Sequence, residues 1–236
     1  MKIALVVGTF FPQPGGAQVQ AHNICNKQKE KNLDIDCYIF NKTNINNNNY
    51  KIIILSKFLI SLVFFFKYYL NLNLNFLLKG YLKKIIKSNN YEFWHFIFLN
   101  HKCLILIDCL KQLNQKVLVT FQGADIQVDQ QINYGFRINR KYDKNLKSVL
   151  KKIDHFFYIS QTIKKDLVDL NILEKKMSYA PNSVEIEKFK NFHDLRLKSE
   201  KLRLITVARY APKKKGYDKL FYIGKELIQK KIDFEW

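Results

Sequence analysis

The sequence has few cysteines and few acidic residues, and each shortage narrows the classes of function. The four cysteines form neither a CxxC pair nor a zinc-ligand spacing, which favours buried thiols in a reducing cytosol. They are Cys25, Cys37, Cys103 and Cys109. Acidic residues number 20 and lysines plus arginines 40, so the net charge is +20. This balance suggests an anionic partner. The excess is nearly all lysine in a chain also rich in Asn, Ile, Phe and Tyr, so A/T-rich codon usage explains much of the charge.

Several signals that would assign a class directly are missing. The chain has no GxGxxG fingerprint of a dehydrogenase. It has no nucleic-acid-binding module or base-reading basic helix, so we expect no nucleic-acid partner. The most apolar stretch, residues 52–66, is shorter than the ~20 residues that a membrane span needs. Lys2 and the apolar start lack a signal-peptide cleavage site, so we interpret residues 3–7 as a first strand.

The chain of 236 residues is 47% hydrophobic, which is ample for a buried core, and it exceeds one typical domain of ~150 residues. Short apolar segments alternate with helical ones, which predicts a parallel, doubly wound sheet. We expect strands at 3–7, 33–40, 51–55, 91–98, 116–120 and 155–159, and helices at 103–113 and 161–170, the latter capped by Ser160. Sites in such sheets lie where strands end. Candidates at such ends are Gly15, Gly16, Gln122, Asp125, Asn182 and Arg209.

The segment from Gly8 to Gln20, GTFFPQPGGAQVQ, joins the first strand to the first helix. Pro12 and Pro14 exclude helix in the loop. Gly15 and Gly16 leave backbone N–H groups open at the helix N-terminus, where the dipole favours an anion by roughly 0.3–1 kcal/mol. Two interpretations stay open, an anion site or a loop that only turns a corner.

Residues 58–87 have a long helical pattern that is aromatic and carries several lysines. One interpretation is one or two buried core helices. The other is an amphipathic surface that rests on anionic lipid.

A second unit begins after the charged tract 185–201, whose composition is typical of an interdomain link. Residues 202–208 predict a strand, followed by the loop Lys213–Gly216 and a helix to about Lys231. A single β-α unit cannot bury its own apolar face, so we expect it to pack loosely.

Five motifs in this order resemble the family-4-type retaining glycosyltransferases of the GT-B fold. They are FFPQPGGAQ, TFQGAD, SQTIKKDL, APNSVEIEKF and VARYAPKKKGYDKL. The resemblance extends from Lys2 to Trp236. It implies two Rossmann-like domains that face each other across a cleft. The N-terminal domain would bind the acceptor and the C-terminal domain a nucleotide-sugar donor.

The resemblance also implies roles in donor binding. Gly15 and Gly16 would lie against the donor phosphates and sugar, and Asn182 would belong to the same site. Arg209 and either Lys214 or Lys215 would hold the diphosphate. Fixed cations and helix N–H groups stabilise a departing nucleoside diphosphate. We therefore expect a UDP- or GDP-linked sugar as substrate, with no metal and no further cofactor.

Two further positions are the catalytic candidates. Asp125 matches a position that orders the site loop, and Gln122 replaces the histidine of the family's T-x-H-G-x-D pattern. Glutamine can donate and accept hydrogen bonds but cannot carry a proton. His95 matches a family histidine, for which we favour a core role. Ser183 replaces the glycine of the family's P-N-G turn.

The chain lacks the paired glutamates with which the family grips the donor, so we expect little or no activity from these residues alone. We predict a Rossmann-like α/β fold, the N-terminal half of GT-B, with an incomplete second Rossmann-like domain. The expected bounds are an acceptor domain at 1–180, a linker at 181–201 and the first donor-domain unit at 202–236.

The predicted function is transfer of a hexose from a nucleotide sugar to a glycan or lipid-linked acceptor, in surface polysaccharide assembly. The alternative is a non-catalytic module that binds an acceptor or a membrane surface and needs a partner donor domain. We expect a cytoplasmic protein, with the cytoplasmic face of an anionic membrane as a further partner.

Overall fold

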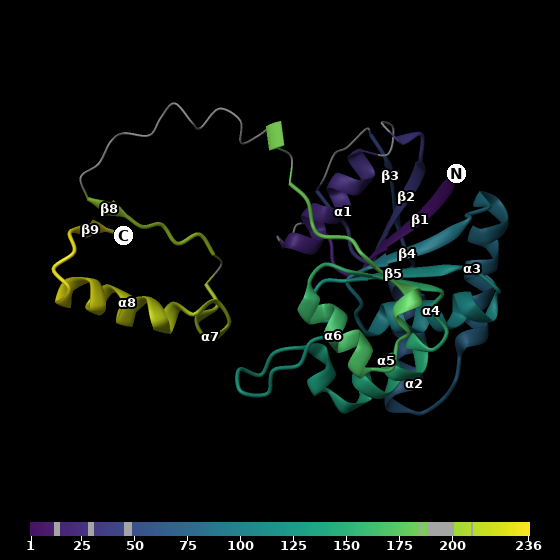
Figure 1. Cartoon of the computed structure of the whole chain (residues 1–236). Helices are drawn as coiled ribbons and strands as arrows, with labels where there is room; N and C mark the ends of the chain where they lie inside the picture. Colours follow the sequence, from purple (N-terminus) through teal and green to yellow (C-terminus); the bar gives the residue numbers. More distant parts are fainter. Residues whose placement is uncertain (12–14, 28–30, 45–48, 185, 188–200, 209) are drawn as a thin grey trace. The chain divides into compact units, whose positions relative to one another are not determined.

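The computed structural model describes residues 1–11, 15–27, 31–44, 49–184, 186–187, 201–208 and 210–236. The chain divides into two compact units (Figure 1). Unit 1 comprises Met1–Asp129 and Gly135–Ser183, and unit 2 comprises Gln130–Tyr134 and Val184–Trp236. Outside the described residues lie Pro12, Pro14, Arg209 and, from the expected linker, residues 185 and 188–200.

In the described part of unit 1, seven parallel strands form one sheet in the order β3-β2-β1-β4-β5-β6-β7. The strands are β1 (Lys2–Val7), β2 (Asp34–Ile39), β3 (Lys51–Ile54), β4 (Phe93–Ile97), β5 (Val117–Phe121), β6 (His155–Tyr158) and β7 (Met177–Tyr179). Strand β1 pairs with β2 on one side and with β4 on the other, so the strand order reverses there. Ligands of doubly wound sheets bind outside the carboxyl ends of the strands at such a reversal.

Helices cover both faces of the sheet (Figure 1). They are α1 (Gly16–Asn26), α2 (Lys57–Tyr69), α3 (Asn75–Asn89), α4 (His101–Gln112), α5 (Arg140–Leu150) and α6 (Gln161–Asp169), with 3-10 turns η2 (Phe136–Ile138) and η3 (Glu174–Lys176). Strand residues point alternately to the two faces. Leu5 of β1 packs in one core cluster with Ala21 and Cys25 of α1, whereas Val6 packs in the other with α2, α3, α4 and α5.

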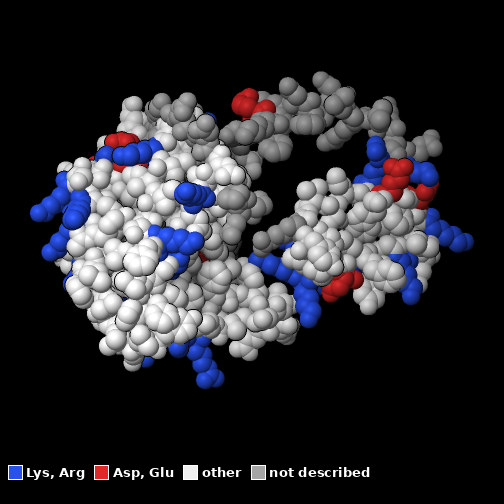
Figure 2. Space-filling view, turned by 180° about the vertical axis from the view of Figure 1, so that it is seen from behind, with Lys and Arg blue, Asp and Glu red and all other residues white. Residues whose placement is uncertain are grey.

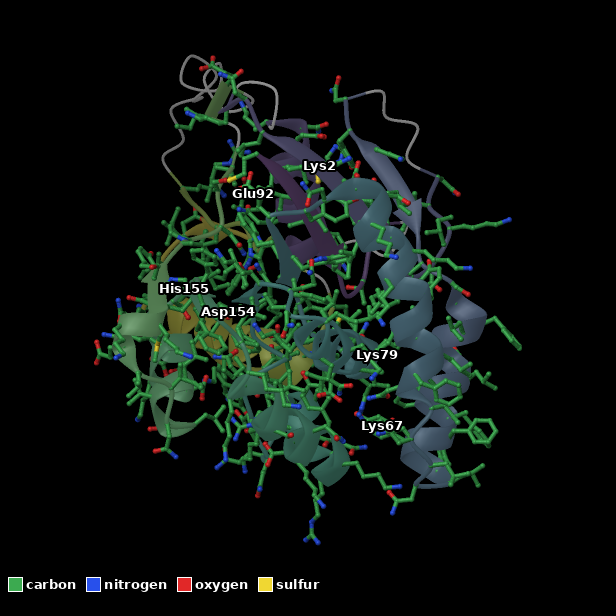
Figure 3. All side chains as sticks on the ribbon, turned by 90° about the vertical axis from the view of Figure 1, so that its right-hand side faces the viewer. Lys2, Lys67, Lys79, Glu92, Asp154 and His155 are labelled. Atoms are coloured by element: carbon green, nitrogen blue, oxygen red, sulfur yellow. The ribbon has the colours of Figure 1, made fainter. Side chains whose placement is uncertain are left out.

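Helix α4 lies at the centre of the second cluster, and residues Cys103–Leu110 are all buried. Its Asp108 carboxylate accepts hydrogen bonds from Lys67 of α2 (3.4 Å), from Asn75 of α3 (3.2 Å) and from Lys152. Figure 3 shows Lys67 on the side of α2 that faces the rest of the unit. Burial raises the pKa of Asp108, but Lys152 and Lys67 outweigh it and hold the pKa below its ordinary value. One carboxylate therefore ties α2, α3 and the end of α5 to α4.

The strands and helices expected in unit 1 are confirmed, with bounds within two residues of the prediction. Ser160 caps α6, since its hydroxyl accepts the Ile163 N–H at 3.3 Å. The long pattern at 58–87 forms two helices, α2 and α3, rather than one. Strand β7 and helix α5 were not predicted. The four cysteines are buried and free, as expected.

Unit 2 contains β8 (Leu202–Arg203), α7 (Pro212–Lys215), α8 (Tyr217–Gln229) and β9 (Phe234–Glu235), and β8 pairs with β9. The strand expected at 202–208 is therefore wrong in length, because only two residues find a hydrogen-bonded partner strand. No described residue of unit 2 is buried. Ile205 and Phe221 are 86% and 72% exposed, so this unit has no core of its own.

Among the described residues, no helix is both long and apolar enough to cross a membrane.

Candidate functional site

The ends of β1 and β4 meet through a close contact of backbones at Gly8. Its N–H donates to Ile97 O at 3.1 Å, and its carbonyl accepts from Asn100 Nδ2 at 2.6 Å. A Cβ on residue 8 would lie 1.9 Å from the carbonyl oxygen of Phe98, so only glycine fits. Phe98 itself has a φ of 63°, which is uncommon for a bulky residue and marks a strained turn at this edge.

Helix α1 begins at this edge, and no side chain of the described residues forms a capping hydrogen bond at its N-terminus. Gly15 is the N-cap residue in extended backbone, and a Cβ on Gly16 would have no atom within 4 Å. The side chain of Gln18 folds back instead, and its Nε2 donates to Thr9 Oγ1 at 2.8 Å. Gln18 Oε1 lies only 2.5 Å from where a Cβ of Gly15 would be, so the Gln18 side chain covers Gly15 while Gly16 stays open. The open position at Gly16 suits the approach of an anion to the first backbone N–H groups of α1.

Gln122 and Asn182 form a reciprocal pair of hydrogen bonds at the ends of β5 and β7. Gln122 Nε2 donates to Asn182 Oδ1 at 3.2 Å, and Asn182 Nδ2 donates to Gln122 Oε1 at 2.9 Å. The next residue, Ser183, donates its backbone N–H to Gln20 Oε1 of α1 at 3.1 Å. Residues that are far apart in the sequence are therefore brought to one edge of the sheet beside the start of α1. The sequence did not single out Gln20, and its place one turn behind Gly16 was the only available signal.

Asp125 holds the loop that carries Gln122. Its side chain is 0% exposed and accepts backbone N–H groups from Leu99 (3.1 Å), Gln122 (3.0 Å) and Gly123 (2.9 Å). The hydroxyl of Tyr142 donates to Asp125 O at 2.9 Å and so binds the loop to α5. Burial raises the pKa of Asp125 to about 6, and the backbone donors offset part of this rise. The carboxylate orders the loop, and the half-buried Gln122 is the side chain that this loop presents to the surface.

Two histidines of unit 1 are held neutral by burial. Inside β4, His95 Nε2 hydrogen-bonds Thr120 Oγ1 at 2.7 Å, and burial lowers its pKa to about 4. The first residue of α4, His101, packs against Phe64, Tyr68 and Tyr142, and burial lowers its pKa too. At neutral pH neither ring supplies a positive charge to the sheet edge.

The remaining donor-site candidates belong to unit 2. Lys214 and Lys215 lie exposed on the short helix α7, and Arg209 lies outside the described residues. A helix therefore occupies the segment that was expected to be a loop, and it ends at Gly216 with a φ of 67°. Unit 1 brings together Gly15, Gly16, Gln122, Asp125 and Asn182. In the described ranges, no group of three or more His, Cys, Asp and Glu residues is arranged to hold a metal ion.

Solved structures share this fold at low identity. Sucrose-phosphate synthase from Thermosynechococcus elongatus is 12% identical with a TM-score of 0.57. The match covers 89% of this chain and 56% of the synthase. HepE from Anabaena, in complex with UDP, is 11% identical with a TM-score of 0.53. The match covers 79% of this chain and 45% of HepE. MurG from Acinetobacter baumannii is 10% identical with a TM-score of 0.51, and the match covers 90% of this chain and 51% of MurG. The chain thus spans about half the length of these structures.

The same fold occurs in an enzyme of another reaction class, UDP-GlcNAc 2-epimerase from Methanocaldococcus jannaschii, with 14% identity and a TM-score of 0.51. The fold alone therefore does not choose the chemistry. No curated protein gives a significant match to the sequence. A family model does match. The model for Glycosyltransferase Family 4 matches residues 14–188, which include α1, the Gln122 loop and Asn182. The chain therefore belongs to glycosyltransferase family 4.

Proposed function

We propose that this chain forms the acceptor-binding half, and the start of the donor-binding half, of a retaining glycosyltransferase. The enzyme transfers a hexose from a UDP- or GDP-sugar to a glycan or lipid-linked acceptor in surface polysaccharide assembly. The observation that supports this most is the sheet edge where the Gln122–Asn182 pair is joined to α1 through the bond from Ser183 to Gln20, with the open Gly16 at the start of that helix. HepE, with which the chain shares its fold, was solved in complex with UDP and with UDP-glucose.

Each residue of this edge has a task in the proposed reaction. The glycines at the start of α1 let the donor phosphates approach backbone N–H groups, which stabilise the charge on the departing diphosphate. The amides of Gln122 and Asn182 orient one another and offer donors and acceptors to a sugar hydroxyl. Asp125 positions Gln122 through the loop backbone. In the proposed reaction, Lys214 or Lys215 supplies a cation to the donor diphosphate, as the family resemblance implies.

Two observations support the proposal that these residues are part of a larger enzyme. The chain covers 56% of sucrose-phosphate synthase and 51% of MurG. In unit 2, apolar side chains such as Ile205 and Phe221 are exposed where a complete domain would bury them. We therefore expect purified 1–236 to transfer little or no sugar from a panel of radiolabelled UDP- and GDP-hexoses to acceptors extracted from the native membrane.

The deciding experiment sequences the native transcript past codon 236 and assays the protein that it encodes. A continuing frame that encodes paired glutamates, and a product that transfers label, support the proposal. In that protein, Gly16→Ala should lower transfer by about tenfold or more, because its Cβ meets the donor rather than the fold. Gly80→Ala, at a helical position with the same empty surroundings, is the matched control and should leave transfer unchanged. Normal turnover by purified 1–236 would contradict the proposal that the chain is a fragment.

A second candidate function is a non-catalytic module that binds an acceptor or a cytoplasmic membrane surface and works with a separate donor domain. The exposed apolar residues of α2 and α3 favour it. A transcript that ends at codon 236, together with label transfer only after a partner protein is added, would support this candidate over the first.

A further inference from the structure

The outer face of α2 exposes large apolar side chains that the rest of unit 1 leaves uncovered. Phe58, Phe65 and Tyr69 are exposed, and with the half-buried Leu62 they form a stripe along one face of the helix, at spacings of four, three and four residues. Phe58 is 79% exposed and Tyr69 is 68% exposed. The opposite face carries Ile60 and Val63, which are fully buried in the core. The helix is thus apolar on both faces, although within the described residues of unit 1 only one face packs against protein.

The exposed apolar surface continues past the end of α2. Leu70 and Leu72 in the connection to α3 are about half exposed, and Phe76 in the first turn of α3 is 62% exposed. The buried residues of α3, Leu78 and Leu82, belong to the same core cluster as those of α2. The outer faces of both helices therefore point away from one core. Single exposed apolar residues are ordinary, but a continuous patch of this kind marks an interaction site.

Along the sequence, the segment that carries the patch has positive charges and no negative ones. From residue 37 to residue 91 the sequence has no aspartate or glutamate and eight lysines: Lys42, Lys51, Lys57, Lys67, Lys79, Lys83, Lys84 and Lys87. Lys57 at the start of α2 and Lys83, Lys84 and Lys87 on the outer face of α3 are exposed. In Figure 2, Lys and Arg side chains project along the outer edge of the larger body, on the side where Figure 1 places α3.

The basic surface extends to the other end of α2. Lys141 Nζ donates to Tyr68 O at 3.0 Å and lies 5.7 Å from the centre of the Tyr69 ring. A cavity of about 450 Å³ opens there, and its lining includes Tyr69, His101 and Arg140. His101 begins α4 directly after the C-terminal end of β4, so this end of α2 lies next to the sheet edge that carries the candidate site.

We propose that the outer faces of α2 and α3 bind the surface of an anionic lipid bilayer. Aromatic and leucine side chains enter the boundary between headgroups and acyl chains, while the lysines contact anionic headgroups. Charge complementarity selects this occupant. A second copy of the chain would oppose one lysine-rich surface to another, whereas an anionic bilayer neutralises the exposed Lys57, Lys83, Lys84 and Lys87. Docking goes beyond the proposed transfer reaction and does not depend on it, but it would bring the sheet edge close to a lipid-linked acceptor.

The test measures cosedimentation of the 236-residue chain with vesicles of phosphatidylcholine containing one quarter phosphatidylglycerol, and with phosphatidylcholine alone. We expect binding to the anionic vesicles that weakens by about tenfold or more between about 0.1 M and about 1 M salt. The triple variant Lys83→Gln, Lys84→Gln and Lys87→Gln should lower binding at least about tenfold. So should the triple variant Phe58→Ser, Phe65→Ser and Phe76→Ser.

Matched controls change other exposed residues of unit 1. Lys144→Gln, Lys165→Gln and Lys175→Gln remove the same charge from α5, α6 and η3. Val128→Ser, Val168→Ser and Leu173→Ser remove exposed apolar groups. Both controls should change binding by less than about threefold. Thermal unfolding checks that every variant is folded.

Equal losses in the patch variants and in their controls would overturn the proposal, as would no binding to anionic vesicles at all. A dimer in sedimentation that Phe58→Ser dissociates would also overturn it and would assign the patch to a second copy. None of these outcomes requires sugar transfer, so failure here is distinct from failure of the proposed enzyme.

Discussion

Asp125 places a carboxylate where no water reaches it, and this gives the protein a stability that depends on pH. Burial raises its pKa to about 6 from the ordinary 3.8. Between these two values the folded chain binds more protons than the unfolded chain, so stability is fully present below about pH 4 and falls as the pH rises through about 6. The loss at neutral pH should be on the order of 2–3 kcal/mol. Urea unfolding of wild type and Asp125→Asn at a series of pH values measures it.

The comparison of these two proteins removes the contribution of other titrating groups. In Asp125→Asn the fall in stability between pH 4 and 6 should become shallower by that amount, because an amide does not ionise. The amide nitrogen would also face one of the backbone N–H groups that now donate to the carboxylate, which lowers stability at every pH. Parallel stability curves for the two proteins would show that Asp125 does not titrate in this range.

Gly8 and Gly80 predict opposite effects of the same substitution. At Gly8 an added Cβ would meet the backbone oxygen of Phe98 at 1.9 Å, so two strands must move apart. Gly8→Ala should cost on the order of 2–3 kcal/mol. At Gly80 the Cβ meets nothing within 4 Å in the middle of α3, so Gly80→Ala should stabilise by about 0.5–1 kcal/mol. Thermal unfolding of both variants checks the pair, and similar melting temperatures would contradict the close contact at Gly8.

A comparison of the N-caps of α4 and α5 gives the contribution of one hydrogen bond, from Asn100 to Gly8 O, to the free energy of unfolding. Asn100 accepts the N–H groups of Lys102 and Cys103 at the start of α4 and also donates to Gly8 O. Asn139 caps α5 in the same way through Lys141 and Tyr142, but within the described part of the chain its side chain makes no hydrogen bond to a strand. Asn139→Ala should cost about 1 kcal/mol. Asn100→Ala should cost about 1 kcal/mol more, because Gly8 O also loses its partner.

Chemical denaturation of the two variants gives this difference directly. Asn100→Asp serves as a further control, since it keeps the cap acceptor but loses the donor to Gly8. Equal costs for Asn100→Ala and Asn139→Ala would show that the bond across the strand ends contributes nothing to stability.

Elements could be predicted from sequence where burial leaves a simple pattern. The central strands are continuous apolar runs, which predict buried strands. Ser160 predicted the start of α6, because a serine hydroxyl can cap a helix N-terminus. Helix α5 was missed although Tyr142, Leu146, Val149 and Leu150 lie at helical spacing, because lysines separate them and hide the stripe. Strand β7 has three residues and gains its structure only from pairing with β6. No local signal marks such a strand.

The candidate site of unit 1 could be predicted only in part, because contacts between residues that are far apart in the sequence leave no local pattern. Gly15, Gly16, Gln122 and Asn182 could be named as candidates because they end strands or begin a helix, positions that the fold class alone brings to one edge. The bond from Ser183 to Gln20 joins residues 163 positions apart and depends on how the segment after β7 leaves the sheet. The exposure of the α2 stripe was likewise not decidable from periodicity, since a helix that is apolar all round has the same sequence pattern when it is buried.

At the scale of the whole molecule, the two units should differ sharply in stability. Strands β4 and β5 lie inside the sheet of unit 1, between layers of helices. Helix α8 of unit 2 has no buried residue, so little besides its own hydrogen bonds and an exposed bond from Tyr217 to Ala208 O opposes its opening. An isolated helix of 13 residues is marginal in water. Hydrogen exchange of the 236-residue chain should therefore be fast in peptides that cover 217–229 and slowest in those that cover 93–97 and 117–121.

The same experiment on a longer native product distinguishes an intrinsic property of α8 from the lack of a core. If further residues complete unit 2, the α8 peptides should become protected by about a hundredfold or more, while those of β4 and β5 stay unchanged, because burial of Phe221 and Ile228 would then oppose opening. Strong protection of α8 in the 236-residue chain would contradict this account. It would mean that the apolar face of the helix is covered in solution by another surface, and mixing the chain with anionic vesicles or diluting it would then show which.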